Sequence, residues 1–341
     1  MEFDIQKRLT LPPPFRQRDD LVSMMPSTLK CLLRALVVFL FWQIGPADAA
    51  ISCSVSATGL AFGDVTSALL ANQTSSTTGT ITFNCTGFAA SSTATVCLSL
   101  DTYNASTTRS MTSGANTLNY QIYQNSSFTT RWGDRADGDV VTIHVSTNSS
   151  GAASGSATMY AQVLTGQTTL PAGSYSQTIP SGANNELAAA NGTATPCTSI
   201  TSNTTGISFT TTATVSNICS ISTANINFGS VPNLSSSVAA TGSIILQCTH
   251  GDAYNVGLNA GSGSGATIAN RLMTYGSYTV TYSLYQNSAH SVVWGNTIGT
   301  NTVSGTGSGA TQTLTVYGLV PVQTAPAAGT FNDTVVATVT Y

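Results

Sequence analysis

Residues 118–126 read LNYQIYQNS, and residues 280–288 read VTYSLYQNS. Each stretch leads to a Trp-Gly pair, at Trp132 in the first copy and at Trp294 in the second, so the spacing is the same in both. A match of this length with constant spacing indicates a duplicated domain. Apolar and polar residues alternate within each copy, which is typical of a strand with one buried face.

The repeat extends outward from this stretch in both directions. The segment CSVSA at 53–57 matches CSIST at 219–223, and the segments that follow keep the same order in both copies. Short alternating segments separated by Gly, Pro and Asn, without a helical period, predict antiparallel β-sandwiches. We therefore expect an all-β chain of two tandem sandwiches, with domains at 50–216 and 217–341.

The charge of the chain argues against one class of function. Charged residues make up 7% of the sequence, and no lysine occurs beyond residue 50. The arginines there are outnumbered by acidic residues. Nucleic-acid binding needs a basic surface that neutralises phosphates, so nucleic acid is not an expected partner. A neutral, lysine-free surface suits a protein that packs into assemblies outside the cell.

The N-terminal segment has the features of a secretory signal. A basic and then apolar run at 30–42 is broken by Gly45-Pro46, and small residues follow up to Ala49. We predict that residues 1–49 are a signal peptide cleaved after Ala49. The true start of translation is expected at Met24 or Met25, which makes the charged prefix a mis-annotated start. The apolar run is too short for a stable membrane anchor.

The cysteines predict disulfides. An even number remains after cleavage, which in an exported chain favours a disulfide framework; these are Cys53, Cys85, Cys97, Cys197, Cys219 and Cys248. Equivalent places in the repeat predict the bridges Cys53–Cys85 and Cys219–Cys248, and Cys97 and Cys197 then pair by elimination. No Cys-x-x-Cys pair occurs, so neither a metal site nor a cofactor is expected.

The two copies differ at their ends. Copy two finishes with an alternating strand that carries one set of side chains on one face, namely Val335, Ala337, Val339 and Tyr341. The corresponding strand of copy one is followed by what reads as an insertion at 180–206. A further alternating strand then follows at 207–215, with Ile207, Phe209, Ala213 and Val215 as its apolar residues. Copy one is therefore expected to have one strand more than copy two.

The ordered set of motifs resembles the spore coat protein U family. Its pattern includes an early Cys, a Phe-Gly, Arg-x-Met, Tyr-x-x-Tyr, Trp-Gly, Val-Tyr-Gly and a final Asp-Thr-Val strand. Copy two keeps almost all of it, including Val316-Tyr317-Gly318 and Asp333-Thr334-Val335. Copy one is looser, with Ala161 where glycine is expected. The resemblance covers nearly the whole mature chain.

Members of that family look like subunits of archaic chaperone–usher pili, and the resemblance implies a fold and partners. It implies immunoglobulin-like, pilin-type sandwiches that lack the last strand and accept a donor strand from the next subunit. In copy two this acceptor edge is expected at Val335, Ala337, Val339 and Tyr341. The implied partners are a periplasmic chaperone, an outer-membrane usher and an adjacent subunit, and the implied location is the cell surface.

The position of the chain in such a fibre follows from two segments. Three residues, 50–52, precede Cys53 after cleavage, and they span about 10 Å when extended, which is too short to fill a neighbour's groove. The strand at 207–215 lies where the donor arm of copy two would be, and we infer that it completes copy one instead. This arrangement resembles a tip adhesin. In a second interpretation, 207–215 is a strand of domain one with no relation to donor arms.

Contact with a surface is expected at loops found only in copy one. The candidates are Phe88, Leu187, Ala188, Ala189 and Ala190, whose apolar tips would suit abiotic or host surfaces and biofilm formation. These residues are equally compatible with partly buried loops. No residue set supports catalysis, so the chain is not expected to be an enzyme. A secreted two-domain carbohydrate-binding module or a spore-coat-like structural protein remains the alternative function.

Overall fold

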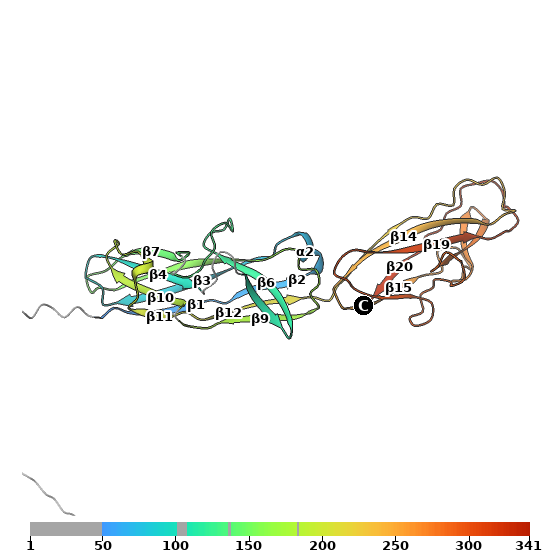
Figure 1. The fold of residues 1–341 in the computed structure, drawn as a ribbon. Helices are drawn as coiled ribbons and strands as arrows, with labels where there is room; N and C mark the ends of the chain where they lie inside the picture. Colours follow the sequence, from blue (N-terminus) through green and yellow to red (C-terminus); the bar gives the residue numbers. More distant parts are fainter. Residues whose placement is uncertain (1–49, 101–107, 136–137, 183) are drawn as a thin grey trace, which may run out of the picture. The chain divides into compact units, whose positions relative to one another are not determined.

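The computed structural model describes residues 50–341 except 101–107, 136–137 and 183 (Figure 1). The predicted signal peptide and start codon lie outside the described residues. Almost all regular structure is strand, and the described helical elements are short: α2 (Ser67–Asn72) and the 3-10 turn η1 (Cys197–Ser199). None of the helices in the described ranges has the length and apolar character needed to cross a bilayer.

The first sandwich combines two sheets around one core. An 8-stranded sheet has the order β1-β3-β8-β6-β5-β9-β12-β2, and a 4-stranded sheet has the order β11-β10-β4-β7. The strands are β1 Ser52–Ala57, β2 Leu60–Val65, β3 Ser76–Thr86, β4 Thr93–Leu100, β5 Arg109–Ser113, β6 Asn116–Tyr123, β7 Val141–Ser146, β8 Ala153–Val163, β9 Gly173–Ile179, β10 Asn185–Asn191, β11 Thr204–Gly206 and β12 Phe209–Val215. Apolar side chains from both sheets form the core.

The second sandwich has fewer paired strands. A 5-stranded sheet has the order β13-β14-β19-β17-β16, and a 3-stranded sheet has the order β18-β15-β20. The strands are β13 Cys219–Ala224, β14 Val238–Cys248, β15 Ala253–Leu258, β16 Arg271–Tyr275, β17 Tyr278–Tyr285, β18 Val303–Thr306, β19 Gln312–Val320 and β20 Ala337–Thr340. Its core is separate from that of the first sandwich. The all-β prediction is confirmed.

The repeated Trp-Gly stretch packs in the same way in both sandwiches. The indole Nε1 of Trp132 donates to the carbonyl oxygen of Leu98 at 2.8 Å, and that of Trp294 donates to Val256 at 2.8 Å. A fully buried arginine, Arg109 or Arg271, donates in turn to the tryptophan carbonyl oxygen. The repeat therefore preserves a hydrogen-bonded pair of tryptophan and arginine in the core of each sandwich.

The three predicted disulfides are confirmed. Cys53 faces Cys85 directly across β1 and β3, and Cys219 faces Cys248 across β13 and β14. The third bridge joins Cys97 on β4 to Cys197 in η1, over a sequence separation of 100.

β12 is the main difference between the two sandwiches. It pairs antiparallel with β9 and parallel with β2, so it lies between them (Figure 1). Its inward side chains are buried, its outward threonines are exposed, and β11 just before it pairs with β10. Apolar and polar residues alternate along β12, because one face of the strand packs on the core and the other faces water.

The expected insertion at 180–206 is wrong in part. Residues 185–191 form β10, which pairs with β4 as β20 pairs with β15. Leu98 and Val256 are equivalent positions, because the backbone oxygen of each accepts the indole hydrogen bond of its sandwich. Leu187 pairs with Leu98 and Val339 pairs with Val256, so Leu187 corresponds to Val339. β10 is therefore the counterpart of β20. The residues that the first sandwich has in addition to the second lie before and after β10, and they include β11 and β12.

We predict that Phe209→Ala destabilises the first sandwich by about 3 kcal/mol, because it removes a buried ring from β12 and leaves a cavity. Phe209 is 6% exposed and lies opposite Ile179 on β9. Hydrogen-exchange mass spectrometry on peptides from β9 measures the loss separately from the second sandwich. Thr210→Ala, on the exposed face of the same strand, is the matched control. Equal exchange in the two variants would contradict the packing role of β12.

Candidate functional site

The second sandwich has an open groove with a volume of about 580 Å³. One wall is the segment that follows β13, and the other is the segment that leads into β20. The lining residues are Thr223, Ala224, Asn225, Ile226, Phe228, Ile244, Leu258, Met273, Tyr282, Leu284, Val316, Phe331, Asn332, Asp333, Thr334, Val335 and Ala337.

This groove lies where β12 lies in the first sandwich. The pairing of Thr112 with Ser176 repeats in the pairing of Thr274 with Asn332, so Tyr175 on β9 corresponds to Phe331. Residues 226–231 correspond to β2 by the repeat. β9 and β2 are the two neighbours of β12, so the groove walls are the counterparts of the strands that hold β12.

Neither wall has a strand partner on the groove side within the described residues. Segment 225–231 forms no ladder, and 333–336 forms none, although their counterparts are regular strands in the first sandwich. Without the strand between them, both segments lose a row of backbone hydrogen bonds. The result is an unpaired edge on each side of a groove in which half-buried core side chains lie.

Core side chains are exposed by this gap. Leu60, Phe62, Met111, Tyr175 and Ile179 are all buried in the first sandwich. Their counterparts are only half-buried, and they are Ile226, Phe228, Met273, Phe331 and Val335. The second sandwich therefore leaves apolar surface uncovered at the place where a strand covers it in the first.

The wall at 226–228 is held in place by close packing on two glycines. A Cβ on Gly242 would lie 2.5 Å from Ile226 Cγ1, and one on Gly318 would lie 2.8 Å from Phe228 Cζ. The ring of Phe228 packs edge-on against Tyr282 at 6.0 Å, as Phe62 packs against Tyr120 at 5.9 Å. The wall keeps the position of β2 even though no strand pairs with it, so the groove is preformed.

The centre of the groove carries a polar pair. The hydroxyl of Tyr282 donates to Asp333 Oδ2 at 2.7 Å, and Asp333 Oδ1 accepts from Ser262 N, Ser262 Oγ and Thr334 N. Burial alone would raise the pKa of Asp333, but these hydrogen bonds outweigh it and hold the pKa below its ordinary value. Burial, followed by the bond to and the charge of Asp333, raises the pKa of Tyr282. The pair is therefore a phenol bound to a carboxylate at neutral pH.

The predicted acceptor-edge residues fall in three places. Val335 and Ala337 line the groove. Val339 pairs with Val256 in β15 and packs against the core, while Tyr341 follows the end of β20 and is 52% exposed. The sequence reasoning missed the other wall, with Ile226 and Phe228, and the Tyr282–Asp333 pair. Aligning the neighbours of the extra strand across the two copies would have found them.

The predicted contact loops are not exposed apolar tips, and this part of the expectation is wrong. Leu187, Ala188 and Ala189 lie in β10 and are fully buried, and Phe88 is 5% exposed. Ala190 is half-buried. The run Leu-Ala-Ala-Ala lacks alternation because both faces of β10 are covered, one by the main core and the other by a small cluster with Cys97, Cys197 and Ile200.

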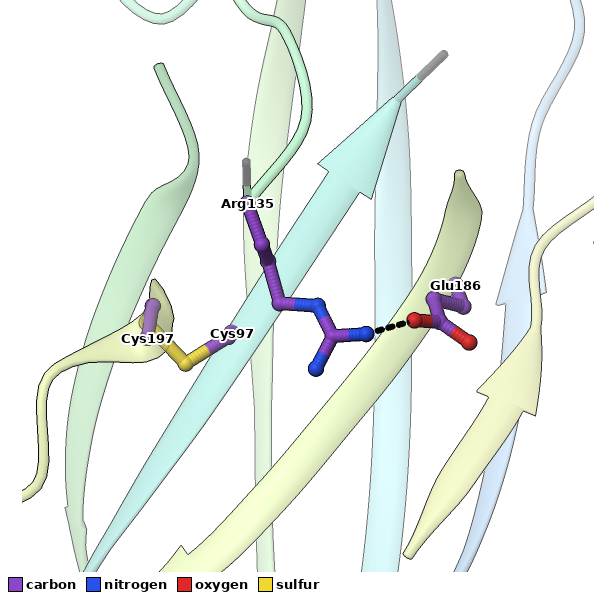
Figure 2. Close-up of polar contacts among 4 residues, drawn as sticks. All are labelled: Cys97, Arg135, Glu186 and Cys197. Atoms are coloured by element: carbon purple, nitrogen blue, oxygen red, sulfur yellow. Dashed lines mark hydrogen bonds and ion pairs between the residues drawn. A yellow bond between two sulfur atoms is a disulfide. The ribbon is translucent and has the colours of Figure 1, made fainter. Parts of the chain in front are cut away.

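A polar contact lies beside that small cluster. Glu186 on β10 pairs with the guanidinium of Arg135, next to the Cys97–Cys197 bridge (Figure 2). Burial raises the pKa of Glu186, and the charge of Arg135 opposes this shift. The ion pair ties the segment that carries Arg135 to β10, and the disulfide ties the Cys197 segment to β4, so the arrangement is structural.

Exposed large hydrophobic side chains gather on the other sandwich. Among the described residues, all of them belong to the second one: Val231, Ile245, Tyr275, Tyr278, Val292, Ile298, Val322, Val336 and Tyr341. The described residues also contain no group of three His, Cys, Asp or Glu side chains arranged to hold a metal ion. The groove is thus the feature of the described chain best suited to binding another molecule.

We predict that Asp333→Asn destabilises the second sandwich by about 1.5 kcal/mol at pH 7, because hydrogen bonds to a carboxylate are stronger than those to an amide. A carboxyl whose pKa is lowered by folding stabilises above its unfolded pKa of about 4 and loses that contribution as pH falls through the folded value. Thermal unfolding curves of the two proteins should therefore converge by about pH 2. A difference that persists unchanged at low pH would contradict the role of the charge.

The family model described as "Spore Coat Protein U domain" matches residues 43–181 and 205–338. The curated "Protein U" of Myxococcus xanthus is 35% identical over 145 residues, which cover 38% of this chain and 80% of that protein.

Two solved structures are similar at low sequence identity. One is the CsuC–CsuE chaperone–tip adhesion subunit pre-assembly complex of Acinetobacter baumannii, with a TM-score of 0.49, 18% identity, and coverage of 85% of this chain and 100% of that one. The other is the CupB6 tip adhesin of Pseudomonas aeruginosa, with a TM-score of 0.35, 13% identity, and coverage of 85% and 94%. The two regions matched by the family model, together with the curated relative, show that this chain belongs to the Spore Coat Protein U domain family.

Proposed function

We propose that the chain is an exported pilus subunit of the chaperone–usher type, whose second sandwich accepts a donor strand from the next subunit. The observation that carries the proposal is that the groove of the second sandwich lies where β12 lies in the first. The position of β12 between β9 and β2 supports this proposal, because it is an equivalent strand within the same chain.

A strand in the groove would be stabilised in two ways. Its backbone would pair with both walls, as β12 pairs with β9 and β2. Its inward side chains would cover half-buried core residues, as Phe209, Ala213 and Val215 do in the first sandwich. Burying a set of side chains of that size is favourable by roughly 5 kcal/mol. Strand addition of this kind combines backbone affinity with side-chain specificity.

The proposed position is the tip of the fibre. The strand just ahead of the second sandwich, β12, is already paired on both sides within the first sandwich. β1 begins at Ser52, so cleavage after Ala49, as the sequence predicts, would leave two residues ahead of the sheet. Such a chain accepts a donor strand and offers none, so it would lie at the end of the fibre, with its first sandwich as the adhesin.

The proposal implies partners and a route. An open groove with two unpaired edges and half-buried core side chains favours aggregation, so a periplasmic chaperone would occupy it before assembly. The outer-membrane usher and the adjacent subunit follow in the pathway. Three disulfides agree with folding in an oxidising compartment. At the cell surface, the first sandwich would mediate attachment and biofilm formation.

The acceptor role can be tested without the partner. Tyr341 corresponds to Ala189, so a second copy of residues 190–215 joined after Tyr341 would reproduce the spacing that delivers β12 in the first sandwich. Cys197→Ser in the copy avoids an extra thiol. We predict that this addition raises the melting temperature of the second sandwich by about 10 °C or more, because it fills the groove. Hydrogen exchange at 331–335 should slow in parallel.

The matched control is the same addition with Phe209→Asn and Val215→Asn in the copy, which keeps length and removes the apolar side chains. It should leave the melting temperature near that of the unmodified chain. An unmodified chain that is already monomeric, with slow exchange at 331–335 and no response to either addition, would contradict the proposal. That result would favour a self-complete carbohydrate-binding module or coat protein.

A further inference from the structure

Resting on the proposed function, we infer that the strand which fills the groove carries a short hydroxyl side chain, serine or threonine, facing Tyr282 and Asp333. Apolar side chains would lie two residues to either side of it, facing Val335 and Phe331. The inference names the chemistry of the partner strand at one position, and it follows from a comparison of the two sandwiches.

The first sandwich has a threonine at this position. Thr211 on β12 is fully buried, and it lies opposite Gln177 on β9 and Leu60 on β2. The Tyr120 hydroxyl donates to Gln177 Oε1 at 2.7 Å, and Thr211 Oγ1 lies 3.3 Å from that hydroxyl. A phenol has one proton to donate, so with that proton on Gln177 the hydroxyl of Thr211 donates to the Tyr120 oxygen.

The second sandwich repeats this geometry without the threonine. Tyr282 corresponds to Tyr120, and Asp333 corresponds to Gln177. The proton of Tyr282 is bound to Asp333 Oδ2 at 2.7 Å. The phenol oxygen and the carboxylate oxygen are therefore both acceptors, and both belong to residues that line the groove. A proton donor on the occupant therefore suits this place, since an apolar side chain would bury a charged oxygen without supplying a hydrogen bond to it.

A hydroxyl fits this position better than a cation. The buried guanidinium of Arg271 interacts electrostatically with both Tyr282 and Asp333. It donates to four backbone carbonyl oxygens, which hold it in place. The charge of Arg271 thus already acts on this site without a direct ion pair to Asp333, and a lysine or arginine from the occupant would meet a like charge in a partly buried site. A short neutral donor supplies a further hydrogen bond to this pair without that repulsion.

The flanking positions follow from the register of β12. Phe209 lies opposite Ile179, and Ala213 lies opposite Tyr175. Their counterparts across the groove are Val335 and Phe331, both half-buried. An antiparallel occupant therefore presents an apolar side chain, a hydroxyl and a second apolar side chain at alternate positions.

The test uses the chain that carries the second copy of residues 190–215, and all changes to the strand are made in that copy. We expect Thr211→Val to lower the melting temperature of the second sandwich by about 6 °C, because an isosteric change removes a hydrogen bond to a charged pair. The matched control is Thr212→Val, which makes the same change on the outward face and should shift the temperature by about 1 °C or less.

A change in the groove tests the pairing itself. Asp333→Gln gives the second sandwich the residue type of the first, whose amide can donate as well as accept. In the Asp333→Gln chain, the drop in melting temperature caused by Thr211→Val should be less than half of the drop in the chain that keeps Asp333. An effect of equal size in both backgrounds would overturn the assignment of the hydroxyl to Asp333.

The remaining outcomes separate the inference from the function on which it rests. If the added copy with Thr211→Val raises the melting temperature as much as the unchanged copy, the inference is overturned, but the groove is still an acceptor of a strand. If no copy stabilises more than the control with asparagines at its apolar positions, the groove is not an acceptor, and the proposed function and the inference both fail.

Discussion

The structure depends on one constraint, which is that a strand in a sheet needs a hydrogen-bonded neighbour on each side or an explicit way to do without one. In the first sandwich β12 satisfies β9 and β2 together. In the second sandwich the corresponding segments at 226–231 and 331–335 have the same sequence pattern and keep their positions, yet they form no ladder with each other. Because no described strand lies between these segments, both of their edges and the core side chains between them are left open.

The periodic and covalent features of the fold could be predicted from the sequence. The duplicated stretch indicated two sandwiches, the alternation at 207–215 indicated the strand, and equivalent cysteines indicated the bridges. These features can be recognised in the sequence because they depend on the spacing of residues along the chain. β10 could not be recognised in this way, because a strand covered on both faces has no alternation, and Leu187 to Ala189 read as a loop.

The candidate site was only half predictable for a related reason. Val335 and Ala337 belong to an alternating strand, so the sequence singled them out. Tyr282 and Asp333 lie 51 residues apart, and their hydrogen bond depends on how two strands meet across the sandwich. The change from Gln177 to Asp333 becomes meaningful only when each residue is seen to face the equivalent tyrosine, Tyr120 or Tyr282. Thr211 lies at this place in the first sandwich, and no described residue lies there in the second. Tertiary geometry, which leaves no period in the sequence, decides this part of the site.

The bridge between Cys219 and Cys248 has a mechanical consequence. It joins the first residue pair of the β13–β14 ladder, and Cys219 follows β12 by three intervening residues at 216–218. A pull on that connection would otherwise peel the edge strand β13 away one hydrogen bond at a time, beginning at Cys219. The covalent link stops peeling at its starting point and passes the load directly to β14, an interior strand. The Cys53–Cys85 bridge ties the second residue pair of the β1–β3 ladder in the first sandwich, so each sandwich has a covalent link near the start of its first strand.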